Sequence, residues 1–224
     1  PDLGSLYGFL LYDFGDGLNG LSVERWGEIP ILRPSEGKLL SAASDIAIYA
    51  GAYYNGSIYA SGQSNKDYLY YTLKIDPANF SYEVLAQVDC FVRDMAFDYT
   101  TGTMFAVLSD DRNTGALAQM DLKTGLFTVV GDTGYEMVAL ACDNEGALYA
   151  VNAAGYLYQL NKDTAEATYR SSTSMSGSMY QSMHYDYNND TIYWAQTSGF
   201  GSKLMRLDPV SYTHLRAHET SAHL

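Results

Sequence analysis

The chain has few basic residues, and none of its apolar runs is long. It carries 13 Lys and Arg against 26 Asp and Glu, which gives a formal net charge of −13. Without a basic stripe to neutralise phosphates, such a chain is a poor partner for nucleic acid or for an anionic membrane surface. No stretch approaches the roughly 20 apolar residues of a membrane span. We therefore expect no nucleic acid partner and no membrane insertion.

Cysteine, histidine and the short motifs of common active sites are also scarce. The sequence has no glycine-rich phosphate loop, no CxxC pair, no GxSxG and no HExxH. Three of its 4 histidines follow residue 209, which leaves His184 and no histidine pair for a metal. A disulfide between Cys90 and Cys142 is disfavoured because they stand at unlike positions, and we expect Cys142 to be a small buried hydrophobe.

The acidic loops at 109–115 and 186–191 place several oxygen atoms close together, as a hard cation requires. Neither loop has the spacing of an EF-hand or of a nonapeptide calcium repeat, so solvated hairpin tips are the preferred interpretation. A structural calcium ion at one of them stays an open alternative. We assign no cofactor, no catalytic residue and no metal ligand.

What the sequence does contain is 21 tyrosines and a unit that recurs roughly every 45 residues. The segments YYNGSIYA, DYTTGTMFAV, DNEGALYAV and DYNNDTIYWA share one pattern, with a turn residue at a matched position in each: Gly56, Gly102, Gly146 and Asp190. A second apolar strand pattern follows each segment. Short alternating runs separated by Gly, Asn and Asp predict strands joined by tight turns. Four such strands in each unit match a propeller blade.

We therefore predict an all-β fold, a partial β-propeller of four-stranded antiparallel blades, with about four to five blades in an open arc. The expected blades are 41–90, 91–135, 136–180 and a truncated 181–209. Residues 1–40 would form a partial blade or the propeller seam. There, LYGFLLYD aligns with a third strand, GLSVERWGE would be its outer partner, and IPILRPSEGKLL would be an insertion or the seam itself.

The end of the chain does not continue the repeat. The segment VSYTHLRAHET at 210–220 resembles an in-frame translation of a sequencing adapter. We therefore interpret 210–224 as a non-native tail and expect it to pack against nothing. The chain starts at Pro1, and we expect the intact protein to have further blades and domains.

Two sets of matched residues follow from the repeat. The first set stands at the turn after each third strand, where a side-chain oxygen can cap the turn, and we interpret it as structural: Asp76, Asp121, Asn161 and Asp208. The second set lies on the strand nearest the axis, where small residues fit: Ala50, Ala96, Ala141 and His184. His184 breaks that pattern and could face the central channel, although a hydrogen-bonded structural histidine is the more frequent case.

The segment MHYDYNNDTIYWAQTSGFGSKLMRLDP resembles a blade of the YWTD and NHL class of β-propellers. DMAFDYTTGTMFAV with LAQMDLKTGLFTVVG resembles repeats of bacterial surface proteins grouped with quinoprotein-like propellers. The resemblance covers about residues 40 to 209 and implies blade structure. IYWAQT departs from YWTD at its last two places, which weakens any tie to the receptor proteins. No catalytic motif of a propeller enzyme is matched, so no functional residue is carried over.

Two classes of function are consistent with such a chain. The first is a non-catalytic recognition or adhesion propeller, secreted or on the cell surface, that binds a glycan or a protein. The alternative is a propeller enzyme, a lyase or hydrolase, with a site at the channel mouth. The scarcity of histidine favours the first, and a site where carboxylates or His184 converge would favour the second.

We expect a binding site on the face built from the loops that join second to third strands and one blade to the next. The candidate ligand-binding residues combine rigid aromatic area with polar groups: Phe91, Arg93, Tyr135, Glu136, Tyr180, His184 and Phe200. The structural alternative is that the aromatic side chains wedge between blades and touch no ligand.

Overall fold

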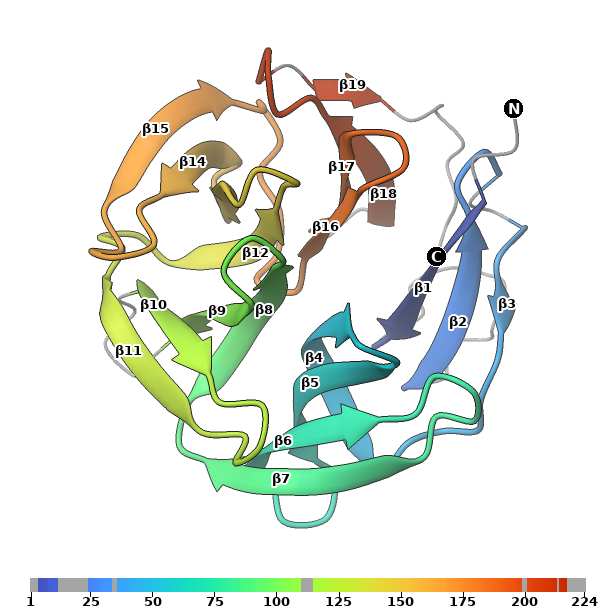
Figure 1. Ribbon diagram of the computed structural model, residues 1–224. Coiled ribbons are helices and arrows are strands. Elements are labelled where there is room, and N and C mark those ends of the chain that lie inside the picture. The colour runs from blue at the N-terminus through green and yellow to red at the C-terminus, as the bar shows by residue number, and fades with distance from the viewer. Residues whose placement is uncertain are drawn as a thin grey trace.

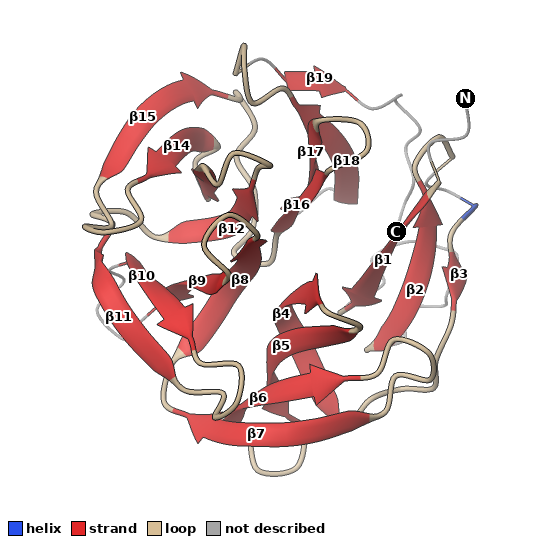
Figure 2. Ribbon diagram, viewed as in Figure 1, coloured by secondary structure: helices blue, strands red, loops and turns tan. Residues whose placement is uncertain are grey.

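The computed structural model describes residues 4–11, 24–33, 36–109, 115–198, 201–212 and 214–216. These residues form five antiparallel sheets, which stand in a circle around a central axis (Figure 1). Strands and loops make up nearly all of the described chain (Figure 2). The all-β propeller fold predicted from the repeat is confirmed, with five blades.

The blades are numbered here in chain order. Blade 1 has three strands, β1 (Ser5–Leu10), β2 (Arg25–Pro30) and β3 (Lys38–Leu39). Blade 2 consists of β4 (Ile46–Tyr54), β5 (Ser57–Ser64), β6 (Tyr70–Ile75) and β7 (Tyr82–Val88). Blade 3 consists of β8 (Phe91–Asp98), β9 (Thr103–Ser109), β10 (Gly115–Met120) and β11 (Phe127–Asp132). Blade 4 consists of β12 (Met137–Cys142), β13 (Leu148–Asn152), β14 (Tyr156–Leu160) and β15 (Ala167–Ser172). Blade 5 consists of β16 (Ser182–Asp186), β17 (Thr191–Ser198), β18 (Gly201–Leu207) and β19 (His214–Arg216).

Blade 1 differs from the expectation drawn from its sequence. Strand β2 pairs with β1 on one side and with β3 on the other, so it is the middle strand and not the outer one. The third strand comes from the segment expected to be an insertion or seam. Lys38 pairs with Glu28 in the ladder and also forms an ion pair with it at 2.9 Å.

Blades 2 to 5 each turn from the third to the fourth strand through the same five-residue corner. The first residue accepts a backbone N–H bond on its side-chain oxygen at 2.8 to 2.9 Å. Its carbonyl accepts the N–H of the fifth residue at 2.7 to 2.9 Å. The first residues are Asp76, Asp121, Asn161 and Asp208, and the fifth, all at positive φ, are Phe80, Gly125, Ala165 and Tyr212. The prediction that the four polar residues cap turns is confirmed.

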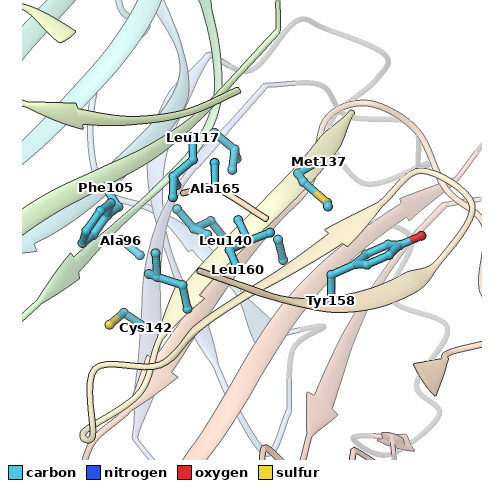
Figure 3. Packing of buried hydrophobic residues seen from close by; sticks show 12 residues of the cluster. Ala96, Phe105, Leu117, Met137, Leu140, Cys142, Tyr158, Leu160 and Ala165 are labelled. Atoms are coloured by element: carbon cyan, nitrogen blue, oxygen red, sulfur yellow. The ribbon is translucent and has the colours of Figure 1, made fainter. Parts of the chain in front are cut away.

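The fifth residue of each corner packs on the preceding blade. Phe80 stacks on Trp26 of blade 1, with ring centroids 5.2 Å apart. The carbonyl of Gly125 accepts a hydrogen bond from Thr72 Oγ1 of blade 2 at 2.9 Å. Ala165 is fully buried in the cluster between blades 3 and 4, where Figure 3 shows it beside Leu117. The corner therefore joins each blade to the one before it.

The expectation that the tail packs against nothing is wrong for its described part. Tyr212 is half-buried at the corner of blade 5, and its carbonyl accepts a hydrogen bond from Ser171 Oγ at 3.0 Å. Strand β19 pairs with β18, so blade 5 extends beyond residue 209. The capped corner fixes the path of the backbone, and its fifth position accepts Phe, Gly, Ala or Tyr. The origin of 210–224 in an adapter stays a prediction.

The apolar core lies between neighbouring blades. Separate clusters of buried side chains join blades 1 and 2, 2 and 3, 3 and 4, and 4 and 5. Within the described part of the chain, no cluster contains residues of both blade 5 and blade 1. Among the described residues, the boundary between the first and last blades is therefore the one without a shared apolar cluster.

The pairing also corrects one matched position on the inner strands. Four residues stand at the same level, each opposite an aromatic residue of the second strand: Ala52, Ala96, Ala141 and His184. The match by sequence alone, which selects Ala50, is wrong. In blade 2 the first hairpin turns through two residues, Asn55 and Gly56, both at positive φ. Since the other blades use longer loops, the register along β4 differs.

Asp94 joins the inner strands of three blades. The register between β8 and β9 shifts between Val92 and Asp94, a bulge of the kind that re-aims a side chain. The carboxylate is fully buried and accepts the backbone N–H groups of Leu140 at 2.8 Å and Met183 at 2.9 Å. Ser182 Oγ donates to it at 3.0 Å, as does the next backbone N–H in the chain. One side chain of blade 3 thus holds blades 4 and 5.

We expect Asp94→Ala to lower the free energy of unfolding by about 3 kcal/mol or more, because two buried N–H groups of other strands lose their acceptor. Urea denaturation measures this. The control is Asp45→Ala, which removes an ion pair with Lys66 at the surface, and its denaturation midpoint should stay unchanged. Equal effects of the two variants would contradict the role given to Asp94.

The same carboxyl makes stability depend on pH. Burial raises the pKa of Asp94 to about 7, although the hydrogen bonds it accepts oppose this, whereas an unfolded carboxyl keeps its ordinary value of 3.8. The folded state thus holds a proton that the unfolded state releases, so this contribution to stability is full below 3.8 and is lost as the pH rises to about 7.

We therefore compare the change in unfolding free energy between about pH 5 and about pH 8 in two proteins. This change should be smaller in Asp94→Asn than in the wild type, by on the order of 2 kcal/mol. The contribution of His184, whose pKa is lowered by partial desolvation, is present in both proteins and cancels in the comparison. Asp98 titrates in another window, because ion pairing and hydrogen bonds overcome the effect of burial and hold its pKa at about 2. Equal pH dependence of the two proteins would contradict this assignment.

Candidate functional site

The propeller has two ends, which carry different loops. We call the end with the loops between successive blades and between second and third strands the linker face; it includes 89–90, 133–136 and 173–181. The opposite end, with the first hairpins and the corners, is called the hairpin face. Inner strands run from the linker face to the hairpin face, so residues early in them lie near the linker face.

Aromatic side chains from three blades meet at the linker face. Tyr49 of β4 lies 4.8 Å from Phe91 of β8 and 5.6 Å from Tyr180 of the loop before β16, measured between ring centroids. Phe91 and Tyr180 are 6.3 Å apart, and Tyr70 of β6 meets Phe91 edge-on at 5.5 Å. We call these four residues the aromatic cluster. Tyr180 is 41% exposed and the others are half-buried, so the cluster presents ring surface to solvent.

An ion pair fixes one side of this cluster. Arg93 contacts Glu136 Oε1 through Nη2 at 2.8 Å and through Nε at 3.2 Å, and Ser109 Oγ donates to the same oxygen. Only 13% of the Arg93 side chain and 17% of the Glu136 side chain are exposed. The guanidinium carbon lies 4.2 Å from the centroid of Phe91, a cation–π contact. The pair thus holds the Phe91 ring and carries no net charge.

The structure brings four of the seven candidate residues together: Phe91, Arg93, Glu136 and Tyr180. Tyr135 instead stacks on Tyr158, with centroids 4.8 Å apart, at the boundary of blades 3 and 4. His184 lines a cavity that opens toward the hairpin face. Phe200 lies outside the described residues.

Sequence reasoning missed Tyr49, Tyr70 and Ser109. A signal for Tyr49 existed, because Tyr49 and Arg93 occupy the same place in the repeat. Each is the residue at which the register between first and second strands shifts. Tyr70 and Ser109 are ordinary strand residues, and their roles depend on contacts that no local pattern marks.

Acidic groups near the axis are already engaged. Glu136 binds Arg93, and the Asp94 carboxylate is occupied by four donors. Among the described residues there is no group of three or more His, Cys, Asp or Glu side chains placed to hold a metal ion. None of the described helices is long and apolar enough to span a membrane. Cys90 and Cys142 are free thiols, and burial raises the pKa of both.

Comparison with known proteins identifies the fold. No protein-family model matches the chain, and no curated protein matches it. An auxiliary nutrient binding protein from Bacteroides thetaiotaomicron VPI-5482 superposes with a TM-score of 0.56 at 13% identity, covering 96% of this chain and 51% of that one. A chain of a nidogen/laminin complex gives 0.56 at 11%, covering 95% and 92%. The PQQ-bound aldose sugar dehydrogenase from Streptomyces coelicolor gives 0.54 at 12%, covering 96% and 84%.

These likenesses show a β-propeller, and the neighbours include YWTD-type and quinoprotein-like propellers, as the blade sequences predicted. At such low identity they establish the fold alone. The chain spans about half the length of the Bacteroides protein that it matches.

We expect Glu136→Ala to lower the free energy of unfolding by about 2 kcal/mol, because it leaves the largely buried Arg93 guanidinium without a carboxylate. The loss should be smaller than for a fully buried pair, since both side chains keep some contact with water. Thermal or urea denaturation measures the change, with Glu83→Ala on the exposed edge of β7 as control. A Glu136→Ala protein as stable as the control would show that the pair contributes nothing to the fold.

Proposed function

We propose that this chain is a non-catalytic binding propeller whose linker face takes a glycan. The observation that carries the proposal is the convergence of aromatic rings from three blades beside a neutral ion pair. Aromatic side chains offer broad apolar area at low entropic cost, and the apolar faces of sugar rings stack on such area. The glutamine and serine groups around the rings supply adaptable hydrogen bonding: Gln63, Ser109 and Ser178.

The charge of the site favours an uncharged glycan over an acidic one. Glu136 neutralises Arg93 within the site, so no free cation of the pair is left to bind a carboxylate or sulfate. The chain as a whole carries a formal net charge of −13, which repels polyanions. A neutral oligosaccharide meets neither obstacle.

Catalysis is the less supported alternative. A lyase or hydrolase needs a positioned acid and base, and a candidate pair should lie within hydrogen-bond reach of a common substrate atom. Near the axis, Glu136 and Asp94 are each held by other partners, and His184 lies at the opposite end from the aromatic cluster. The described residues therefore support binding better than acid–base chemistry.

We further propose that the protein acts outside the cell or on its surface. The support is the fold shared with an auxiliary nutrient binding protein of Bacteroides, whose name assigns it a binding role. A protein ligand at the same face is the second candidate partner, because exposed tyrosines also anchor protein interfaces.

The test compares two equally exposed tyrosines. Tyr180 and Tyr82 are each 41% exposed, but Tyr180 belongs to the aromatic cluster and Tyr82 lies on the outer strand β7. On an array of neutral oligosaccharides, Tyr180→Ala should weaken binding about fivefold to thirtyfold, which corresponds to a loss of about 1 to 2 kcal/mol in binding free energy. Tyr82→Ala should bind as the wild type does.

Tyr82→Ala should unfold at the wild-type temperature, and Tyr180→Ala should lose about 1 kcal/mol of stability or less, because its ring contacts Tyr49 and Phe91 but stays partly exposed. An array that shows no binding, or binding that survives Tyr180→Ala, would refute the glycan site. Binding of acidic glycans in preference to neutral ones would refute the argument from charge. Parallel loss of stability and binding in Tyr180→Ala would return the ring to a structural role.

A further inference from the structure

A cavity of about 290 Å³ lies on the axis near the hairpin face, away from the aromatic cluster. Its walls come from the inner strands of blades 2 to 5, with the matched alanines Ala52, Ala96 and Ala141 leaving the space. Met95 and Met183 also line it, and their backbone N–H groups donate to Asp94. The buried Asp94 carboxylate therefore lies directly behind the cavity, between it and the linker face.

Three tyrosines from different loops and strands form the rim. Tyr53, Tyr99 and Tyr187 are 54%, 52% and 42% exposed, so their rings border an opening to solvent. The hydroxyl of Tyr99 donates to the carbonyl of Tyr53 at 3.4 Å, and Tyr99 meets Tyr187 edge-on at 5.3 Å. Tyr187 in turn donates to the carbonyl of Cys142 at 3.3 Å. These contacts fix the rings in place and pre-organise the rim.

His184 is the polar group that this cavity offers. Its side chain lines the cavity and is exposed, and none of the described residues forms a hydrogen bond with its imidazole. Protein atoms around the ring desolvate it in part although it is exposed, which lowers the pKa of His184, and the ring is neutral at neutral pH. Burial raises the pKa of the Cys142 thiol to about 12, so that group is uncharged as well. One ring nitrogen of His184 can thus accept a hydrogen bond.

The lining restricts what can bind. Among the described residues that form the walls, none is Asp, Glu, Lys or Arg, so an anionic ligand would lose its hydration without gaining a counter-charge. A sugar would leave most of its hydroxyls without partners against alanine and methionine. A flat, uncharged ring with one donor would satisfy both the walls and His184. The volume stands at the lower end of small-molecule sites, about 300–1,000 Å³, and suits one small ring system.

We propose that this cavity is a second ligand site, which takes an uncharged aromatic or heteroaromatic compound and orients it by a hydrogen bond to His184. The rim tyrosines contact the edge of the ring, and the alanine and methionine walls contact its faces. The site goes beyond the glycan-binding role proposed for the linker face and is independent of it.

The test uses indole as the probe, because it is an uncharged heteroaromatic ring with a single N–H donor. In protein labelled at its methionine methyl groups, indole should shift the NMR signals of Met95 and Met183, which line the cavity. It should leave the signal of Met120 unchanged, since that residue is buried outside the cavity between blades 2 and 3. Glucose and benzoate, tested in the same way, should shift none of the three.

Two variants then test the assigned contacts. His184→Phe keeps a ring but removes the acceptor nitrogen, and should weaken indole binding about fivefold to tenfold, the worth of one hydrogen bond. Ala52→Leu fills the cavity and should abolish binding. Tyr169→Ala, which removes a 56% exposed tyrosine of outer strand β15, should bind indole as the wild type does. Tyr180→Ala should also bind indole as the wild type does, because Tyr180 lies at the linker face. That result would show that the two sites are independent.

Several results would overturn the proposal. No shift of Met95 or Met183 up to the solubility limit of indole would mean that the cavity is not a site. Unchanged binding in Ala52→Leu would place indole elsewhere. Binding of glucose or benzoate as tight as that of indole would refute the ligand class. Should His184→Phe fail to fold, the methionine signals and Ala52→Leu still decide between these outcomes.

Discussion

The buried carboxylate of Asp94 is the constraint on which the centre of this propeller depends. The five blades are separate sheets, so inner strands of different blades share no ladder hydrogen bonds. Backbone N–H groups on those strands need an acceptor, and the Asp94 carboxylate supplies it to one N–H of β12 and one of β16. The hydrogen bond from β16 joins blade 5 directly to blade 3, although blade 4 lies between them in the chain. It also divides the axis into two halves, so the linker face and the hairpin face offer separate surfaces.

Away from the axis, the blades are held by a device that each one repeats. The corner after the third strand places its fifth residue on the preceding blade, so blades 2 to 5 each attach backward along the chain. Stability in such an arrangement is a sum of nearest-neighbour interfaces, as in other repeat proteins. Blades 1 and 5 are the exceptions, because no apolar cluster of described residues joins them. The hydrogen bonds from Ser182 and Met183 to Asp94 join blades 3 and 5, which are not consecutive.

The features predicted correctly from sequence are those that depend on local pattern. Strand alternation and capped corners follow from residues close together in the chain. For His184 the pattern favoured a hydrogen-bonded structural residue, whereas its side chain lines the axial cavity. Asp94 could not be recognised, because its partners lie 46 and 89 residues away. The residues at the matching position of the other blades are not acidic, so the repeat gives no signal either. The position of Ala52 at the same level as Ala96 and Ala141 was missed because a two-residue turn in blade 2 alters the register. The packing of Tyr212 was missed because its corner position is set by backbone geometry. At the linker face, Tyr49 was missed although its place in the repeat matches that of Arg93.

The acidity of the chain has a structural origin. Aspartates recur at corners and hairpins, where their side-chain oxygens accept backbone N–H bonds: Asp76, Asp98, Asp121, Asp143, Asp186 and Asp208. The charge therefore accumulates with each blade as a consequence of how turns are capped, whatever the protein binds. At the axis the pattern reverses. Arg93 is neutralised by Glu136, and the cavity beside His184 is lined by uncharged side chains of the described chain. A negative exterior around neutral aromatic sites repels anions and leaves uncharged ligands unopposed, which is why both proposed ligands are neutral.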